Sequence, residues 1–353
     1  MLAPGINAIF QMFAKKGYRC PLGLFFHIPF PPRDVFDQLQ HSEVVLQGIL
    51  GSDRVTFQTK EYSHNFLGCC KRLKGCSVDF NAEVVWYEGR KIDVRVTPVG
   101  HSYDFFSALS HGTLSEHCRP EIKELYNTKG NQTIIIGAER LDYTKGLEYR
   151  ALAYQRFLNK YPQHNGKVTY LQIAVPARPN APGFTHLKHK YEEFVTRVNS
   201  ELVAMGYQSR IKVIMGKVSQ RDLAILYKMS DVAMVTTLRD GMNLVAFEYV
   251  ACQTLHPGVL ILSPYAGAAE TLVEALKVRK LLTPPPLFRL FVYQSPFSDP
   301  YDIDHMADTL HRAVVMPTEE RKARMENLQK SARGQSVTKW VRLNLDPLIN
   351  VHE

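Results

Sequence analysis

The amino-acid sequence predicts an α/β protein whose C-terminal part forms a doubly wound parallel sheet. Short apolar, β-branched runs alternate with helical patterns from Gln132 onward, and these runs lie at residues 133–136, 168–175, 211–215, 232–236 and 259–262. Strands that alternate with helices in this way form parallel sheets covered by helices. Two of the runs are followed by a polar loop and then a helix, an arrangement that places ligand groups at the carboxyl edge of the sheet.

Length and composition indicate an ordinary globular protein with two domains. The chain has 353 residues, of which 45% are hydrophobic and 22% are charged, so it can bury sizeable cores. No apolar run reaches the roughly 18 residues of a membrane-spanning helix. The N-terminus also lacks the basic and apolar regions of a secretory signal. We therefore expect a cytoplasmic protein that has no membrane partner.

The net charge of +9 favours anionic ligands. The basic residues form no dense run, so a solvated basic surface is favoured over a nucleic-acid site. Cys69, Cys70 and Cys76 lie close to His64 in the sequence and raise the alternative of a zinc site. Structural zinc would need paired Cys-x-x-Cys ligands, which the sequence lacks. We expect free thiols of a reducing compartment, no bound metal and no nucleic-acid partner.

The N-terminal third predicts a mixed set of strands and helices. Glu88-Gly89-Arg90 is a turn signal between two alternating strands, so these strands are expected to form a hairpin. The predicted elements are strands at 21–29, 54–58, 83–87 and 91–96 and helices at 33–50 and 63–73. Residues 97–129 are mixed and polar, and they predict a linker between domains.

The end of the chain predicts three helices and one segment that fits no regular element. Pro284, Pro285 and Pro286 block regular structure, yet the residues that follow are too apolar for a solvated loop. Helical patterns resume afterwards at residues 302–314, 319–332 and 337–345. We find no internal repeat in the sequence.

The first polar loop, Glu139–Gly146, carries two cations, Arg140 and Lys145, after the strand at 133–136. A guanidinium fork together with a mobile ammonium suits the charge of a diphosphate better than one lysine does. This spacing therefore predicts a phosphate site. The alternative is that Arg140 pairs with Asp142 and that Lys145 is merely exposed.

The second polar loop, Leu238–Leu244, carries a carboxylate and a glycine before a helix. Gly241 allows close approach of a ligand, and a helix that opens at Met242–Val245 offers free N–H groups to a phosphate. Glu248, about one turn further on, would accept hydrogen bonds from both hydroxyls of a ribose. Alternatively, Asp240 only caps the helix and Glu248 is a surface residue. Together the two loops suit a phosphorylated ligand with hydroxyls, such as a nucleotide sugar.

Two further residues and one turn are weaker candidates. His27 ends a strand before several prolines, where it is either structural or a hydrogen-bond donor to a sugar hydroxyl. Arg178 follows the strand at 168–175 and is either a ligand for a second anionic group or a solvated arginine. The small residues of Ser263–Ala268 fit close backbone packing beside the cleft. The sequence contains no Ser-His-Asp order, no P-loop and no HExxH motif.

Several of these strings together resemble those of trehalose-6-phosphate synthases, the UDP-forming retaining glucosyltransferases. The resemblance extends over roughly residues 20–278 and resumes near Pro300. It rests on the matching segments 25–31, 139–146, 172–176, 239–246, 248–251 and 258–269. Glycogen synthases and other two-domain glycosyltransferases are similar in architecture but do not contain these strings.

The resemblance implies a GT-B architecture, in which two Rossmann-like doubly wound domains face each other across a cleft. We place an acceptor-side domain at residues 1–115 and a nucleotide-sugar-binding domain at 116–345, with an atypical insertion near 279–299. The implied reaction transfers glucose from UDP-glucose to glucose 6-phosphate and gives trehalose 6-phosphate with retention. It uses no cofactor, no metal and no enzyme nucleophile. The departing diphosphate, stabilised by cations, helps to deprotonate the acceptor.

The resemblance also assigns site residues by position. Arg140, Lys145 and Asp240 are the implied catalytic residues. Asp240, Gly241, Met242 and Asn243 are implied to contact the glucose hydroxyls, and Leu244, Val245, Ala246 and Glu248 to contact phosphate and uridine. Val218 is implied to contact uracil. His27 is implied to contact the donor glucose and Arg178 the acceptor phosphate.

The chain departs from the family pattern at several places. It begins after the family's His-Asp-Tyr-His segment, so we expect an incomplete N-terminal domain that lacks most of the acceptor site. Phe247 stands where the family has lysine, and residues 98–102 differ from a Gly-Ile-Asp type linker. We therefore expect this chain to turn over glucose 6-phosphate poorly by itself. The alternative is a non-catalytic nucleotide-sugar-binding or regulatory subunit of a trehalose synthase complex. The protein partners that we consider are a second copy of the chain, in a homo-oligomer, and a partner in a synthase complex.

Overall fold

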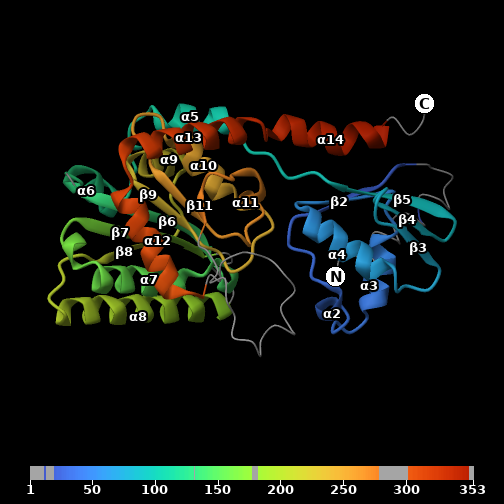
Figure 1. Ribbon diagram of the computed structural model, residues 1–353, viewed down its shortest axis with the longest axis horizontal. Coiled ribbons are helices and arrows are strands. Elements are labelled where there is room, and N and C mark those ends of the chain that lie inside the picture. Colours follow the sequence, from blue (N-terminus) through green and yellow to red (C-terminus); the bar gives the residue numbers. More distant parts are fainter. Residues whose placement is uncertain (1–11, 13–19, 131, 177–181, 278–300, 350–353) are drawn as a thin grey trace. The chain divides into compact units, whose positions relative to one another are not determined.

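The computed structural model describes residues 12, 20–130, 132–176, 182–277 and 301–349. The chain divides into two compact units, and it passes between them twice (Figure 1). Unit 1 contains the residues up to Gly100 and those from Gln335 onward, whereas unit 2 is the continuous stretch His101–Gly334. The predicted insertion at 279–299 lies outside the described residues.

Unit 1 is built on a five-stranded mixed sheet with the strand order β1-β2-β5-β4-β3. β1, β2 and β5 are parallel, and β4 is antiparallel to both of its neighbours. The predicted hairpin of β4 and β5 is confirmed, and Glu88 and Gly89 of its turn both have positive φ, at 50° and 73°, as in a type I′ turn. The prediction missed β3. The strands are β1 (Gly23–Phe26), β2 (Arg54–Phe57), β3 (Cys76–Asp79), β4 (Val84–Tyr87) and β5 (Arg90–Val96).

The predicted single helix at 33–50 is wrong. The structure has two helices there, α2 (Arg33–Phe36) and α3 (Ser42–Ile49), because the chain turns between them and His41 adopts a left-handed conformation at φ 65°. The turn lets Phe36 and Ile49 both reach the same core. A helix predicted at 63–73 is instead α4 (Lys60–Cys70).

The start of α4 is set by a capping residue. Thr59 has an extended backbone, and its hydroxyl accepts a hydrogen bond from the Tyr62 N–H at 3.3 Å. Such an N-cap satisfies one of the free donors of the first turn. The helix therefore begins earlier than the apolar pattern alone suggested. The remaining helix of unit 1 is α14 (Val337–Ile349), which contacts β1.

Unit 2 contains a six-stranded parallel sheet with the order β11-β10-β9-β6-β7-β8. All five predicted strands are confirmed, and the prediction missed β11 because this strand has only two residues. β6 continues through Arg140 to Leu141, so the first predicted loop begins later than expected. The strands are β6 (Thr133–Leu141), β7 (Val168–Pro176), β8 (Ile211–Met215), β9 (Val232–Val235), β10 (Val259–Leu262) and β11 (Leu276–Lys277).

Helices cover both faces of this sheet (Figure 1). One face carries α7, α8 and α12, and the other carries α5, α9, α10 and α13, with α6 beside α9. The 3₁₀ turns η1 (Tyr143–Lys145) and η2 (Pro162–His164) flank α7. The helices are α5 (Tyr103–Ser110), α6 (Pro120–Thr128), α7 (Leu147–Lys160), α8 (Pro182–Ala204), α9 (Gln220–Met229), α10 (Leu244–Cys252), α11 (Ala268–Thr271), α12 (Ile303–Val315) and α13 (Thr318–Arg333).

The predicted linker at 97–129 is wrong for most of its length. It contains α5 and α6, both of which bury an apolar side: Phe106 on α5, and Ile122 and Leu125 on α6. α5 packs against α9 and α10, so residues after Gly100 belong to unit 2. The predicted domain boundary at 115/116 lies later in the chain than this division, and the predicted end at 345 falls within α14 of unit 1.

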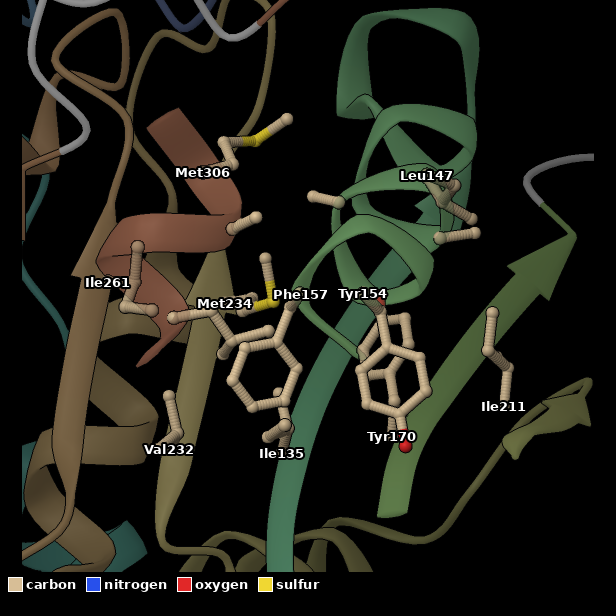
Figure 2. Packing of buried hydrophobic residues seen from close by; sticks show 14 of the residues in the cluster. Ile135, Leu147, Tyr154, Phe157, Tyr170, Ile211, Val232, Met234, Ile261 and Met306 are labelled. Atoms are coloured by element: carbon tan, nitrogen blue, oxygen red, sulfur yellow. The ribbon is translucent and has the colours of Figure 1, made fainter. Parts of the chain in front are cut away.

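The main core of unit 2 lies between the sheet and the helices α7, α8 and α12. Figure 2 shows the aromatic rings of Tyr154 and Phe157, from α7, above the strands that carry Ile135 and Tyr170. The rings of Tyr154 and Tyr170 are 5.5 Å apart. Large buried aromatic rings contribute much of the apolar area that holds a core together. This packing makes the sheet a rigid support for the polar loops at its carboxyl edge.

Candidate functional site

A pocket of about 360 Å³ opens at the carboxyl edge of the unit 2 sheet. It brings the two polar loops together, as the sequence predicted from the ends of β6 and β9. Eight predicted site residues line it, namely Arg140, Lys145, Val218, Asp240, Met242, Asn243, Leu244 and Val245. Six further lining residues were not predicted, namely Ala138, Glu139, Ile173, Val175, Leu223 and Tyr227.

Lys145 is held in the pocket by an ion pair with the second loop. Its side chain is almost completely buried, and its Nζ lies 2.5 Å from Asp240 Oδ2. The interpretation of Lys145 as a merely exposed lysine is therefore wrong. The turn that places it depends on Gly146, which has a φ of +67° and lies so close to β9 that an added Cβ would be 2.7 Å from the carbonyl oxygen of Thr236.

Arg140 is the exposed cation of the pocket. No described residue forms an ion pair with it, and its supposed partner Asp142 instead accepts hydrogen bonds from the N–H and hydroxyl of Thr144, both at 2.9 Å. The alternative pairing of Arg140 with Asp142 is therefore absent from the described part of the chain. The guanidinium is thus available to an anion that enters the pocket.

Asn243 connects the carboxylates of the two loops. Its Nδ2 donates to Asp240 Oδ2 at 3.1 Å and to Glu139 Oε1 at 3.2 Å. Asp240 therefore accepts from both Lys145 and Asn243. A carboxylate with two fixed donors has a defined orientation, so this arrangement presents an ordered acceptor to the pocket.

A buried ion pair lies behind this layer, between Glu139 and Arg150 of α7. The Nη2 of Arg150 lies 3.7 Å from Glu139 Oε1 and donates to the carbonyl of Lys145 at 2.5 Å, while Nη1 donates to the carbonyl of Met234 at 2.9 Å. Burial raises the pKa of Glu139, although the two nearby cations oppose this. The network fixes the backbone of Lys145 from behind.

Sequence reasoning missed Arg150, although the sequence carried a signal for it. Arg150 lies on α7 at the same helical face as Leu147, Ala151 and Tyr154, which are all buried. A charged residue within an apolar helical face must find buried partners, since an unpaired buried charge is very costly. The pattern therefore pointed to an internal carboxylate, and Glu139 is that carboxylate.

The N-terminus of α10 meets the pocket. Asn243 occupies the N-cap position without a side-chain cap bond, and Leu244 and Val245 of the first turn line the pocket. The first N–H groups of a helix have no intrahelical partner and carry the positive end of the helix dipole. Gly241 and Ala246, which were also predicted, are both buried beside these residues.

The turn Ser263–Ala268 packs against the second loop, as expected. The N–H of Asp240 donates to the carbonyl of Tyr265 at 3.1 Å, and the N–H of Gly267 donates back to the carbonyl of Asp240 at 3.1 Å. This parallel bridge ties Asp240 to the neighbouring strand-to-helix connection. The position of its carboxylate is therefore set by the backbone on both sides.

Glu248 adjoins the pocket through Tyr227. It lies one turn into α10, it is half-buried, and its Oε2 accepts from the hydroxyl of Tyr227 at 3.4 Å. Desolvation raises the pKa of Glu248 to about 7. The interpretation of Glu248 as a surface residue is wrong. The neighbouring Phe247 is fully buried with its ring 4.8 Å from that of His101, so it belongs to the core.

The geometry of this pocket does not test two of the predicted site residues. His27 belongs to unit 1, where it is exposed and its ring lies 4.6 Å from that of Phe25. Arg178 falls in the range 177–181, outside the described residues. Neither assignment is tested by the geometry.

The cysteines carry no sign of a shared site. All six are free thiols. Cys69 and Cys70 are buried in α4, and burial raises the pKa of Cys69 to about 11. Over the described ranges, no three His, Cys, Asp or Glu side chains are grouped closely enough to hold a metal ion. Nor does this part of the chain contain a helix long and apolar enough to cross a membrane.

The fold and this pocket define an α/β protein with a charged pocket at the carboxyl edge of a parallel sheet. Residues 8–279 match glycosyltransferase family 20. The chain belongs to this family.

Relatives within the family are trehalose-phosphate synthases. The chain is 35% identical over 331 residues to alpha,alpha-trehalose-phosphate synthase [UDP-forming] A of Dictyostelium discoideum, and the match covers 94% of this chain but 42% of that protein. The chain therefore spans less than half the length of this curated relative.

Solved structures show the same fold. The E. coli protein bound with UDP-2-fluoro glucose has a TM-score of 0.84 at 31% identity, covering 98% of this chain and 71% of that chain. A UDP-forming synthase from Burkholderia xenovorans in complex with glucose-6-phosphate has a TM-score of 0.83 at 29% identity, covering 98% and 72%. These matches confirm the predicted GT-B fold class and the resemblance to UDP-forming trehalose-6-phosphate synthases.

Proposed function

We propose that the pocket of unit 2 binds UDP-glucose and that the protein transfers its glucose to glucose 6-phosphate, forming trehalose 6-phosphate. One observation carries the proposal: an exposed arginine, a buried Lys145–Asp240 pair and the N-terminus of α10 meet in one pocket. The same classes of group are needed for a diphosphate that is attached to a sugar. Relatives named as UDP-forming synthases supply the choice of donor and acceptor.

The diphosphate would lie between Arg140, Lys145 and the first turn of α10. Arg140 supplies a fork for two phosphate oxygens, and Lys145 supplies a fixed point charge. The N–H groups of Leu244 and Val245 would receive a third oxygen. All of these groups carry a positive charge or the positive end of a dipole. They therefore stabilise the negative charge that grows on the diphosphate as it leaves.

The glucose would lie against Asp240. A carboxylate has room for about four hydrogen bonds, and Lys145 and Asn243 hold that of Asp240 in place. Sugar hydroxyls would donate to it, which fixes the anomeric carbon in front of the diphosphate. Orientation of this kind lowers the entropic barrier of the transfer.

The uridine would lie toward Val218 and Tyr227, which line the pocket. The backbone of Val218 would hydrogen-bond the edge of the uracil ring. Glu248 would accept hydrogen bonds from the ribose hydroxyls, and its raised pKa makes this contact dependent on pH.

In the proposed reaction, the bond from the anomeric carbon to the diphosphate oxygen breaks and its electron pair leaves with UDP. The acceptor hydroxyl forms the new bond on the same face of the sugar, and its proton passes to the departing phosphate oxygen. Arg140 and Lys145 act by stabilising the negative charge on UDP. We also propose that the protein works in the cytoplasm, since its six unpaired cysteines suit a reducing environment.

Calorimetric titration with UDP-glucose tests the proposal. We expect saturable binding that Arg140→Ala weakens by at least about tenfold and that Arg197→Ala, an exposed arginine on α8, leaves unchanged. Absence of binding by the folded wild-type chain, or equal binding by the two variants, would contradict the donor assignment. Release of UDP on addition of glucose 6-phosphate tests the acceptor assignment separately.

A further inference from the structure

A second pocket, of about 290 Å³, lies at the opposite edge of the unit 2 sheet. Its walls include residues just before β6, β9 and β10, namely Lys129, Asp231 and Gly258. Strands of a parallel sheet all begin at the same edge, so this pocket lies at the amino ends and the donor pocket at the carboxyl ends. Nothing in the proposed function uses it.

The second pocket has more cations than anions. Lys129 is already engaged, because its Nζ donates to the carbonyl of Met229 and lies 3.4 Å from Asp231 Oδ2. Asp231 also accepts from the N–H of Ile134 at 2.8 Å. By contrast, no described residue forms an ion pair with Lys228. The one carboxylate of the pocket is thus neutralised, and the ammonium of Lys228 remains in excess.

Apolar side chains complete the pocket and stand open to solvent. Leu255 is 64% exposed and Tyr126 is 48% exposed, although both line a concave site, and Ile225 forms a buried part of its wall. Exposed large apolar side chains that border a pocket mark binding surfaces more often than isolated ones do. The volume lies at the lower end of the range for small-molecule sites, so the occupant is small.

We propose that this second pocket binds a small organic anion, with a carboxylate or phosphate near Lys228 and an apolar body against Tyr126 and Leu255, and that it acts as an effector site. Helix α9 supports the effector role. Leu223 and Tyr227 of this helix line the donor pocket, whereas Ile225, Lys228 and Met229 line the second pocket.

Two hydrogen bonds connect the ends of the two pockets through α9. Lys129 holds the last carbonyl of α9, and Tyr227 on the same helix bonds Glu248 at 3.4 Å. An anion that draws Lys129 or Lys228 toward itself changes the restraint on the end of α9, and with it the position of the Tyr227 hydroxyl. Binding energies at two coupled sites change each other by the same factor.

Phenyl phosphate is a suitable probe, because it joins an anion to an aromatic ring. Binding is measured by calorimetry and saturation-transfer NMR in the presence of saturating UDP, which occupies the donor pocket. We expect saturable binding that is at least tenfold weaker in Lys228→Glu and unchanged in Lys322→Glu, an exposed lysine on α13. We also expect inorganic phosphate and benzyl alcohol to bind at least tenfold more weakly than phenyl phosphate.

His256→Glu provides a second variant at an exposed lining position, in case Lys228→Glu does not fold. Equal affinity of wild type and the folded charge-reversal variants would overturn the site, as would displacement of phenyl phosphate by UDP. The effector role rests on the proposed donor function and is measured apart from it. Saturating phenyl phosphate is expected to change the Kd for UDP-glucose at least twofold, and an unchanged Kd would overturn that role while leaving both binding sites standing.

Discussion

Arg140 and Lys145 are cations of one pocket with opposite surroundings. Arg140 is exposed, whereas Lys145 is buried against Asp240 and next to the Glu139–Arg150 pair. Removing a solvated charge costs the fold little, but removing one partner of a buried pair leaves the other charge uncompensated. The two residues therefore separate ligand affinity from stability.

We predict that Arg140→Ala weakens UDP-glucose binding by about 1.5–3 kcal/mol, the usual loss for a hydrogen bond to a charged group, with an unchanged free energy of unfolding. Lys145→Met should lower both, and its cost in stability should reach about 3–5 kcal/mol because the buried carboxylate of Asp240 loses this cation. Urea unfolding and calorimetric titration of both variants measure the two effects. A Lys145→Met variant as stable as wild type would contradict the assignment of a structural pair.

The carboxyl of Glu248 predicts a pH dependence. Its pKa of about 7 in the folded chain lies above the ordinary value of 4.5, so folding favours its protonated form and stability falls as the pH rises from 4.5 to 7. The ribose contact has the opposite sign, because the carboxylate is the better acceptor. We predict that UDP-glucose affinity rises by about tenfold between pH 6 and pH 8.

Glu248→Gln is the matched control for this prediction, since glutamine keeps the shape and cannot titrate. The variant should bind UDP-glucose with an affinity that is flat across this range. UDP-glucose is preferred to UDP as the ligand, because it has no terminal phosphate that titrates near neutral pH. A pH profile identical in wild type and variant would remove Glu248 from the ribose site.

At the scale of the element, Gly146 sets the turn from η1 into α7. Its φ of +67° would strain any other residue, and an added Cβ would also meet the Thr236 carbonyl oxygen at 2.7 Å. We predict that Gly146→Ala costs more than the roughly 1–3 kcal/mol of backbone strain alone. Gly75→Ala is the control, because Gly75 has a similar φ of +83° but no heavy atom within 4 Å of its added Cβ. Chemical unfolding of both variants should show the larger loss at Gly146.

The contact of α12 with η2 should weaken in acid. Nε2 of His164 lies 3.0 Å from Nδ1 of His311, whose ring stacks on Tyr161 at 3.8 Å. The pair accommodates one donor and one acceptor, and burial lowers the pKa of His164. The unfolded chain therefore binds more protons below pH 6.5, so stability should fall as the pH decreases through that value.

Thermal unfolding between pH 5 and pH 8 tests this contact. Lys160 and Asp308, which pair at 2.5 Å, also lie beside Tyr161. A control variant is therefore needed to show that the change in stability comes from the histidine. His164→Phe retains an aromatic ring that can stack on Phe157 and removes the titrating group. The variant should lose most of the decrease in Tm between pH 7 and pH 5, and an unchanged profile would locate the acid sensitivity elsewhere.

At the scale of the whole molecule, the two units have separate apolar cores. We predict two calorimetric unfolding transitions, of which UDP-glucose raises only the one that belongs to unit 2. A ligand at about 100 times its Kd stabilises the state that binds it by about 2.7 kcal/mol. At the same ligand concentration, Arg140→Ala should reduce the shift by half or more. A ligand-induced shift of both transitions would contradict a donor site confined to unit 2.

The sequence predicted the parallel sheet and the meeting of the two loops because the alternation of strands with helices and the chemistry of the loops are local signals. It did not predict α5 and α6, whose short apolar faces were hidden among polar residues, or the break at His41, which depends on packing of both helices into one core. In the site, Arg140, Lys145 and Asp240 came from their loops. Arg150 and Tyr227 were missed because they lie on α7 and α9, outside the two loops, and because their partners Glu139 and Glu248 come from other elements.

The double passage of the chain between units has a consequence for its synthesis. Unit 2 is one continuous stretch, so it can fold as soon as it leaves the ribosome. Unit 1 cannot be completed then, because Asn344 of α14 accepts hydrogen bonds from Thr56 at 2.9 Å and from Thr97 at 3.1 Å. The strands of unit 1 are synthesised first, but the helix that contacts them is synthesised only after all of unit 2. A newly made chain therefore forms the pocket proposed for the donor before those strands have gained the contacts of α14.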